Sequence, residues 1–241
     1  MNGRVRLGIL TPSSNTVLEP LTAAILDDLP EVTAHFSRFK VTEIALSPGA
    51  VAQFDDDAIL RAADLLADAK VDAIAWSGTS AAWLGFARDV ALCERILAST
   101  GRPAATAVLA VNEALAASGA KRLGLVTPYR DDVQAKIIAN YDAAGIAVVS
   151  ERHLGISDNY AFAEEPPDRV EALIREVAAD KPEAIAVLCT NMRGAPLVSE
   201  LEAEFDIPIH DSVALTVWKS LKLAGVDPTR VQGWGRVFAG G

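Results

Sequence analysis

The chain has 241 residues, 51% of them apolar and 22% charged, and a formal net charge of −10 at pH 7. This acidic balance argues against a nucleic-acid partner, which selects basic surfaces, and the longest apolar runs are shorter than the roughly 20 residues of a membrane-spanning helix. The N-terminal segment lacks the pattern of a signal peptide, and two cysteines are too few for a disulfide framework, so we expect a cytoplasmic protein without a membrane partner.

Strand-like and helix-like stretches alternate from the N-terminus. Strands are predicted over 5–12, 34–41, 71–76 and 103–108, and helices over 16–29, 55–69, 85–99 and 108–118. In DDDAILRAADLLADA (55–69), apolar residues recur at helical spacing, and acidic residues stand at the start, where the helix dipole favours negative charge. Alternating elements with continuously apolar strands indicate parallel sheets covered by helices on both faces.

The second half of the chain repeats the first. VRLGILTP (5–12) resembles KRLGLVTP (121–128), VDAIAWSGTS (71–80) resembles PEAIAVLCTN (182–191), and RPAATAVLAV (102–111) aligns with IPIHDSVALT (207–216). Three matches in the same order indicate two copies of one βα unit.

We therefore expect an α/β protein with two pseudo-symmetric doubly wound lobes, each with a short parallel sheet flanked by helices. The first lobe would comprise residues 1–107 plus 213–241, and the second residues 108–212. Doubly wound folds bind ligands outside the carboxyl ends of their strands. If the lobes face each other, four loops at strand ends meet in one cleft, namely 11–16, 77–83, 127–132 and 189–194.

Polar residues gather in the first three of these loops. In TPSSNT, Ser14 and Asn15 either cap a helix or help to bind an anion. In WSGTSAAW, Gly78 permits a close backbone approach beside the donors Thr79 and Ser80, which suits an oxyanion site, although a plain turn has the same composition. In TPYRDD, Tyr129 either reaches the cleft with its phenol or keeps its hydroxyl in water.

The fourth loop contains the one cysteine that stands at a strand end. In IAVLCTNMRG, Cys189 is either a thiol whose pKa a following helix N-terminus lowers, or an inert buried side chain. Cys93 lies on the apolar stripe of a predicted helix, and we expect it in the core. In the aligned repeats Gly78 falls opposite Cys189, so the site has one thiol and can protonate a substrate from one face only.

These motifs together resemble the loops of the aspartate/glutamate racemase superfamily, in its arylmalonate decarboxylase and maleate cis-trans isomerase branch. The segments that carry the resemblance are PSSNT, GTS, TPY and Cys-Thr-Asn, and it extends over nearly the whole chain. It implies two α/β lobes with the active site between them, no cofactor and no metal. It also implies a small carboxylate or dicarboxylate as the substrate of a monomer or homo-oligomer.

By similarity, Cys189 supplies a proton, and Thr79, Ser80 and Tyr129 bind a substrate carboxylate or the enediolate formed from it. Backbone amides near Ser80, Cys189 and Thr190 assist. Asn15 and Asn159 correspond to positions where maleate isomerases hold a carboxylate. The remaining substrate-binding candidates from the same motifs are Ser14, Gly78, Thr190 and Asn191.

The first hypothesis is decarboxylation of a small malonate-type dicarboxylate. Racemases and isomerases of the superfamily carry a second cysteine where this chain has Gly78, and the decarboxylase carries glycine. One carboxylate would lie among hydrogen-bond donors, the other would face apolar walls, and Cys189 would protonate the enediolate.

Two alternatives stay open. PSSNT, Asn159 and Cys-Thr-Asn are more isomerase-like, but maleate-type cis-trans isomerisation or Asp/Glu-type racemisation would need Ser77 or Ser80 in place of the missing thiol. A non-catalytic protein that binds a small carboxylate would keep the same loops. Among the histidines, which show no metal-ligand spacing, His210 ends a strand and is expected to be a structural residue with satisfied hydrogen bonds.

Overall fold

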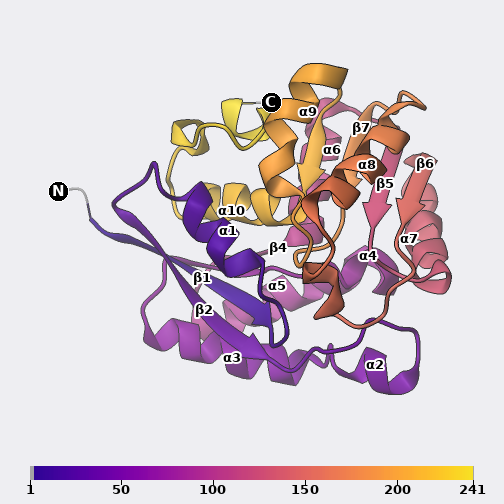
Figure 1. Ribbon diagram of the computed structural model, residues 1–241. Coiled ribbons are helices and arrows are strands. Elements are labelled where there is room, and N and C mark those ends of the chain that lie inside the picture. Colours follow the sequence, from indigo (N-terminus) through magenta and orange to yellow (C-terminus); the bar gives the residue numbers. More distant parts are fainter. Residues whose placement is uncertain (1–2, 241) are drawn as a thin grey trace.

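The computed structural model describes residues 3–240 and shows two four-stranded sheets (Figure 1). The elements up to the end of the first sheet are β1 (Val5–Pro12), α1 (Leu18–Ile25), β2 (Val32–Phe39), α2 (Pro48–Ala52), α3 (Asp56–Asp68), β3 (Ala73–Trp76), α4 (Ala81–Leu84), α5 (Phe86–Thr100) and β4 (Ala104–Thr106). Within the described residues, no helix is both long and apolar enough to cross a membrane.

The second sheet follows after one connecting helix. Its part of the chain contains α6 (Ala107–Ser118), β5 (Arg122–Thr127), α7 (Asp131–Ala143), β6 (Ala147–His153), α8 (Pro167–Ala178), β7 (Ala184–Val187), α9 (Val198–Phe205), β8 (Ile209–Asp211) and α10 (Ser212–Leu223). Short 3₁₀ turns occur at Ala161–Ala163, Ala195–Leu197, Pro228–Arg230 and Arg236–Ala239.

The two sheets have the same topology. All their strands are parallel, and their orders are β2-β1-β3-β4 and β6-β5-β7-β8. Each strand of the first sheet thus has a counterpart at the same place in the second. The prediction of a two-lobed α/β fold built from one repeated unit is confirmed.

Helices cover both faces of the sheets, as expected for strands that are apolar throughout. On the first sheet, α3 and α5 pack against each other and the strands, and α1 packs with α10 on the other side. On the second sheet, α8 packs on β5, β6 and β7, and α7 packs on β6. In Figure 1, α10 lies between the two sheets, and it contacts β3, β4 and β8.

Local sequence explains where several helices begin or end. Asp55 caps α3 by accepting a hydrogen bond from the N–H of Asp57 at 3.0 Å. Helices α5 and α6 end at Gly101 and Gly119, which adopt left-handed φ values of 68° and 70°. The helix predicted over 16–29 is shorter than expected, and the short helices α2 and α4 were not predicted.

The lobes contact each other at several places besides the segments of chain that connect them. Helix α4, from the first sheet's part of the chain, packs on α7 of the second, and the C-terminal tail bonds to both lobes through Arg230 to Glu31 and Arg236 to Asp206. Because α10 contacts α1, β3 and β4, we keep residues 213–241 with the first lobe as a proposal.

Candidate active site

A small cavity lies where the carboxyl ends of both sheets meet. Its volume is about 20 Å³, and seven of the ten predicted site residues line it. These seven are Gly78, Thr79, Ser80, Tyr129, Asn159, Cys189 and Thr190; Pro12, Val41, Ile44, Phe54, Trp76 and Trp83 complete the wall. The four strand-end loops therefore converge on one point between the lobes.

Tyr129 and Thr79 connect the lobes inside this cavity. The Thr79 Oγ1 and Tyr129 Oη atoms are 2.6 Å apart, and only 2% of Tyr129 is exposed. The phenol thus reaches the cleft, and its hydroxyl does not lie in bulk water. Burial raises the pKa of Tyr129 well above its usual value, and the neighbouring Cys189 adds to this effect, so the phenol keeps its proton.

Cys189 is buried at the floor of the cavity, with the N–H of Asn191 donating to its Sγ at 3.4 Å. The expectation that a helix N-terminus lowers its pKa is wrong. The segment that follows is a turn, and α9 begins only at Val198. Burial raises the pKa of Cys189 to about 12, although hydrogen bonds from Asn191, Tyr129 and Met192 oppose the increase. At neutral pH the side chain is therefore a protonated thiol.

Asp211 lies buried behind the loop of Cys189. Its Oδ1 accepts from the N–H groups of Val213 and Ala214 at 2.8 and 3.1 Å, which caps α10, while its Oδ2 has no partner among the described residues. Burial raises the pKa of Asp211 to about 7. When ionised, this carboxylate disfavours a thiolate at Cys189 and helps to keep the thiol protonated.

Two indole groups supply further donors that were not among the predicted site residues. Trp76 and Trp83 both line the cavity, and the Nε1 atom of each is buried without a partner in the described part of the chain. Buried donors normally have a partner, and a ligand acceptor in the cavity would provide one. The nearby aromatic residue Phe86 packs on Tyr141 and does not line the cavity.

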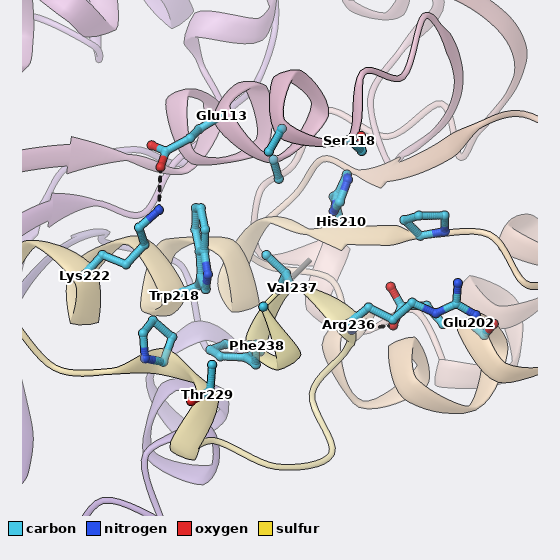
Figure 2. A pocket seen from close by; sticks show the side chains of 15 residues that line it. Glu113, Ser118, Glu202, His210, Trp218, Lys222, Thr229, Arg236, Val237 and Phe238 are labelled. Carbon is cyan, nitrogen blue, oxygen red and sulfur yellow. Dashed lines mark hydrogen bonds and ion pairs between the residues drawn. The ribbon is translucent and has the colours of Figure 1, made fainter.

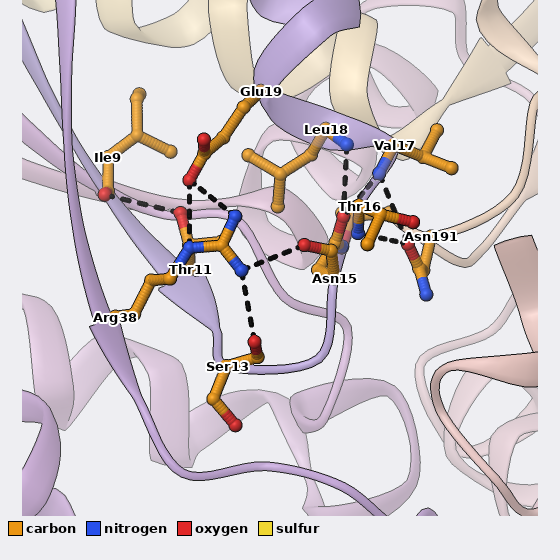
Figure 3. A network of polar contacts seen from close by, with 11 residues as sticks. Ile9, Thr11, Ser13, Asn15, Thr16, Val17, Leu18, Glu19, Arg38 and Asn191 are labelled. Carbon is orange, nitrogen blue, oxygen red and sulfur yellow. Dashed lines mark hydrogen bonds and ion pairs between the residues drawn. The ribbon is translucent and has the colours of Figure 1, made fainter.

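Asn15 and Asn191 lie one layer behind the cavity and hold the start of α1 (Figure 3). The Oδ1 of Asn15 accepts from the N–H groups of Val17 and Leu18 at 3.0 and 2.9 Å. The Oδ1 of Asn191 accepts from those of Thr16 and Val17 at 3.0 and 3.3 Å. Because Asn191 follows β7, a residue of the second lobe caps a helix of the first.

The same network reaches the cavity wall. Asn15 Nδ2 donates to Thr190 Oγ1 at 3.2 Å, and Thr190 Oγ1 donates to the carbonyl oxygen of Ser77 at 3.1 Å. Asn159 Nδ2 donates to Ser14 Oγ at 2.8 Å. The predicted substrate-binding residues that belong to this network without lining the cavity are Ser14, Asn15 and Asn191, and their assignment stays a prediction.

Arg38 fixes the loop that carries these residues. Its Nη1 donates to the carbonyl oxygens of Ser13 and Asn15 at 3.0 and 2.9 Å, and its Nε and Nη2 donate to Glu19 Oε1 at 3.0 and 2.7 Å (Figure 3). This guanidinium is a positioning group, since it faces the back of the loop and does not line the cavity.

A covering segment, residues 41–54, closes the cavity from the first lobe. Val41, Ile44 and Phe54 of this segment line the cavity. The backbone N–H of Ile44 donates to the carbonyl oxygen of Ser157 at 2.8 Å, which ties the segment to the second lobe. A volume of about 20 Å³ holds roughly one water molecule. A ligand larger than a water molecule therefore requires the cavity to widen.

A second cavity of about 640 Å³ lies between α6, α10, β8 and the C-terminal tail (Figure 2). It contains none of the predicted site residues. His210 lines it, and neither ring nitrogen has a partner among the described residues, so the expected satisfied structural histidine is wrong. Burial lowers the pKa of His210 to about 4, so the ring is neutral. The charged groups Glu113 and Lys222 at its edge pair with each other.

Comparison with known proteins identifies the family. A profile described as arylmalonate decarboxylase matches residues 16–238. The chain belongs to the arylmalonate decarboxylase family. The resemblance found in the loops is thereby confirmed, and the match covers all of the second sheet and the first sheet except β1.

Relatives in this family are enzymes of two kinds. A maleate isomerase from Pseudomonas putida is 27% identical over 98% of this chain and 97% of its own. An arylmalonate decarboxylase from Bordetella bronchiseptica is 26% identical over 96% and 95% of the two chains.

Solved structures of the family superpose closely on the chain. The maleate isomerase of Pseudomonas putida S16 with maleate has a TM-score of 0.89 at 29% identity, with 98% of both chains covered. A Nocardia farcinica maleate cis-trans isomerase variant with a covalently bound succinylcysteine intermediate has a TM-score of 0.87 at 27% identity, with 98% of this chain and 99% of the other covered.

Proposed function

We propose that this chain is an enzyme that forms an enediolate-like anion from a small dicarboxylate and protonates that anion with Cys189. The observation that carries the proposal is the buried, protonated thiol of Cys189 in a cavity shared by the two lobes. The dicarboxylate follows from the family, in which a related isomerase has been solved with maleate.

The cavity wall supports this chemistry because it contains both hydrogen-bond donors and apolar groups. The hydroxyls of Thr79 and Tyr129 and the indole N–H groups of Trp76 and Trp83 are suited to a carboxylate whose negative charge increases during the reaction. The apolar side chains of the covering segment would contact the rest of the substrate.

The site geometry favours decarboxylation within this class of reactions. The bond between the central carbon and one carboxylate breaks, its electron pair passes into the remaining carboxylate to give an enediolate, and CO2 leaves. Cys189 then transfers its thiol proton to the carbon, and a proton from water restores the thiol. One proton donor is sufficient, and Cys93, the other cysteine, lies on α5 outside the cavity.

The comparisons favour cis-trans isomerisation over decarboxylation. Maleate isomerases supply a relative and two structures that cover nearly the whole chain, and one of them forms a covalent succinylcysteine intermediate. A comparable route in this chain needs a nucleophile opposite Cys189. Ser80 lines the cavity and Ser77 is buried beside it, so these two hydroxyls are the candidates for that role.

Paired assays with maleate and with phenylmalonate distinguish these reactions. Formation of fumarate identifies an isomerase, and release of CO2 identifies a decarboxylase; binding of succinate without either reaction identifies a carboxylate-binding protein. We expect Cys189→Ser to lose at least about 100-fold in turnover with an unchanged circular dichroism spectrum. Cys93→Ser is the control and should keep full activity. Undiminished turnover in Cys189→Ser would refute the proton-donor role.

A further inference from the structure

The space opposite Cys189 is filled by a tryptophan that comes two residues before Gly78. A Cβ atom built on Gly78 would lie 2.1 Å from Cζ2, 2.4 Å from Cε2 and 2.5 Å from Cη2 of Trp76. Carbon atoms that are not bonded to each other keep about 3.5 Å or more apart. Any side chain at position 78 therefore needs the indole of Trp76 to move.

The indole has little freedom to move. Trp76 ends β3, which lies between β1 and β4, and 1% of its surface is exposed. Its ring packs on Phe39 with a centroid separation of 4.8 Å and an interplanar angle of 46°. Displacing it would open a core that is packed on both faces of the sheet, and such rearrangements destabilise a protein.

The edge of the indole next to Gly78 also faces the cavity. The atom Cε2, which is near position 78, is bonded to Nε1, and Nε1 has no partner among the described residues. A substrate in the cavity thus meets the Cys189 thiol on the side of the second lobe and an indole edge on the side of the first.

We propose that Trp76 excludes a second acid–base group from this site, because its indole occupies the space that a side chain at position 78, opposite Cys189, would need. The inference rests on the proposed function in so far as Cys189 is the proton donor. The packing part of the inference, that the Trp76 indole excludes a side chain at position 78, does not depend on any reaction. Glycine at position 78 is then a consequence of Trp76, and a thiol introduced there cannot take part unless the indole is removed.

A cycle of variants measures the packing component by thermal unfolding. Gly78→Ala should lower the Tm of the wild-type protein by about 5 °C, because it forces Cβ into the indole. In a Trp76→Leu background the same change should alter Tm by less than about 1 °C. Gly49→Ala is the control, since nothing lies within 4 Å of a Cβ there. Equal effects of Gly78→Ala in both backgrounds overturn the proposal.

A second experiment measures facial selectivity with α-methyl-α-phenylmalonate, which is prochiral. The wild-type protein, Trp76→Leu and Gly78→Cys should each give one enantiomer of the monoacid. Trp76→Leu/Gly78→Cys has a thiol on each face and should give a nearly racemic product. Racemic product from Gly78→Cys alone, or a single enantiomer from the double variant, overturns the proposal.

The two experiments separate this inference from the proposed function. If the wild-type protein converts neither a malonate nor maleate, the proposed function fails, and the Tm cycle still decides whether Trp76 excludes a side chain at position 78. If turnover is present but the variant cycle shows no coupling between positions 76 and 78, the inference about Trp76 is refuted and the proposed function is unaffected.

Discussion

Cys189 and Tyr129 share one buried corner of the cavity, and burial determines the protonation of both. The pKa of Cys189 is raised to about 12, and that of Tyr129 is raised well above its usual value. Both groups are therefore neutral donors near neutral pH. Neutral donors suit a negatively charged substrate, because they stabilise developing charge and one of them can give up its proton to carbon.

Removing the Tyr129 hydroxyl tests its contribution directly. Tyr129→Phe keeps the ring but loses the group that lies 2.6 Å from Thr79 Oγ1. We expect turnover to fall by roughly 10- to 100-fold, since loss of one donor to a developing oxyanion has effects of about this size or larger. Steady-state kinetics on whichever substrate the paired assays identify provides the measurement.

Tyr141→Phe is the matched control for this change. Tyr141 is also fully buried, its hydroxyl has no partner among the described residues, and it does not line the cavity. Its replacement should leave turnover unchanged. Equal losses in the two variants would show that Tyr129 acts through stability alone.

The internal repeat predicted which residues meet in the site, but not how they are packed. Thr79 and Cys189 could be placed together because they follow the matching strands β3 and β7, and Tyr129 because it follows β5, the neighbour of β7. The position of the Trp76 ring over Gly78 could not be predicted, because it depends on side-chain packing across the core. The sequence left the pKa of Cys189 open between two alternatives, because the depth of burial that raises it, and the turn that follows in place of a helix, depend on the fold.

Two helices begin at polar caps of different origin. Helix α1 has no capping side chain at Val17, and its first amides bond to Asn15 and to Asn191 from the other lobe. Asn15 could be predicted as a cap, but Asn191 could not, because it is distant from α1 along the chain. Helix α10 is capped locally by Asp211.

The cap of α10 predicts a pH-dependent stability. The pKa of Asp211 is about 7 in the folded protein and about 4 in an unfolded chain. Between these values the folded state holds a proton that the unfolded state has lost, so stability falls as pH rises. Asp211→Asn keeps an accepting Oδ1 without the charge. We expect the unfolding free energy of Asp211→Asn, relative to that of the wild type, to increase from pH 4 to pH 7 and then to level off. The total increase should be up to about 4 kcal/mol.

Chemical denaturation at several pH values measures this difference in unfolding free energy. His210 also titrates, but both proteins contain it, so its contribution cancels from the difference. Asp227→Asn is the control: this exposed aspartate caps a 3₁₀ turn through the N–H of Thr229, and its pKa is lowered. It should show a small difference of opposite sign. A pH-independent difference for Asp211→Asn would contradict the prediction.

At the scale of the whole molecule, the covering segment joins the lobes over a closed cavity. Glu43 and Asp158 form an isolated antiparallel bridge, flanked by bonds from Ile44 N–H to Ser157 and from Asn159 N–H to Thr42. Because these two bonds come from the neighbouring residues, Glu43 and Asp158 are a non-hydrogen-bonded pair. The Cα atoms of such a pair lie about 4.5 Å apart, which is within the range that a disulfide spans.

A disulfide at this bridge tests whether opening is needed for turnover. Oxidised Glu43→Cys/Asp158→Cys should lose at least about 10-fold in activity, because the cavity of about 20 Å³ cannot admit a dicarboxylate while closed. Reduction with dithiothreitol should restore the activity. Each single variant is a control and should be insensitive to the reductant. Full activity of the oxidised double variant would show that substrate enters by another route.

The position of α10 has a consequence for how the protein is made. This helix packs on α1, β3 and β4, yet it is synthesised only after the entire second sheet. A growing chain thus carries the first sheet with part of one apolar face uncovered until residues 212–223 leave the ribosome. The N-terminal half cannot complete its fold ahead of the C-terminal half, as domains often do during translation. Any nascent chain that stops before α10 therefore exposes a surface that chaperones bind and that aggregation exploits.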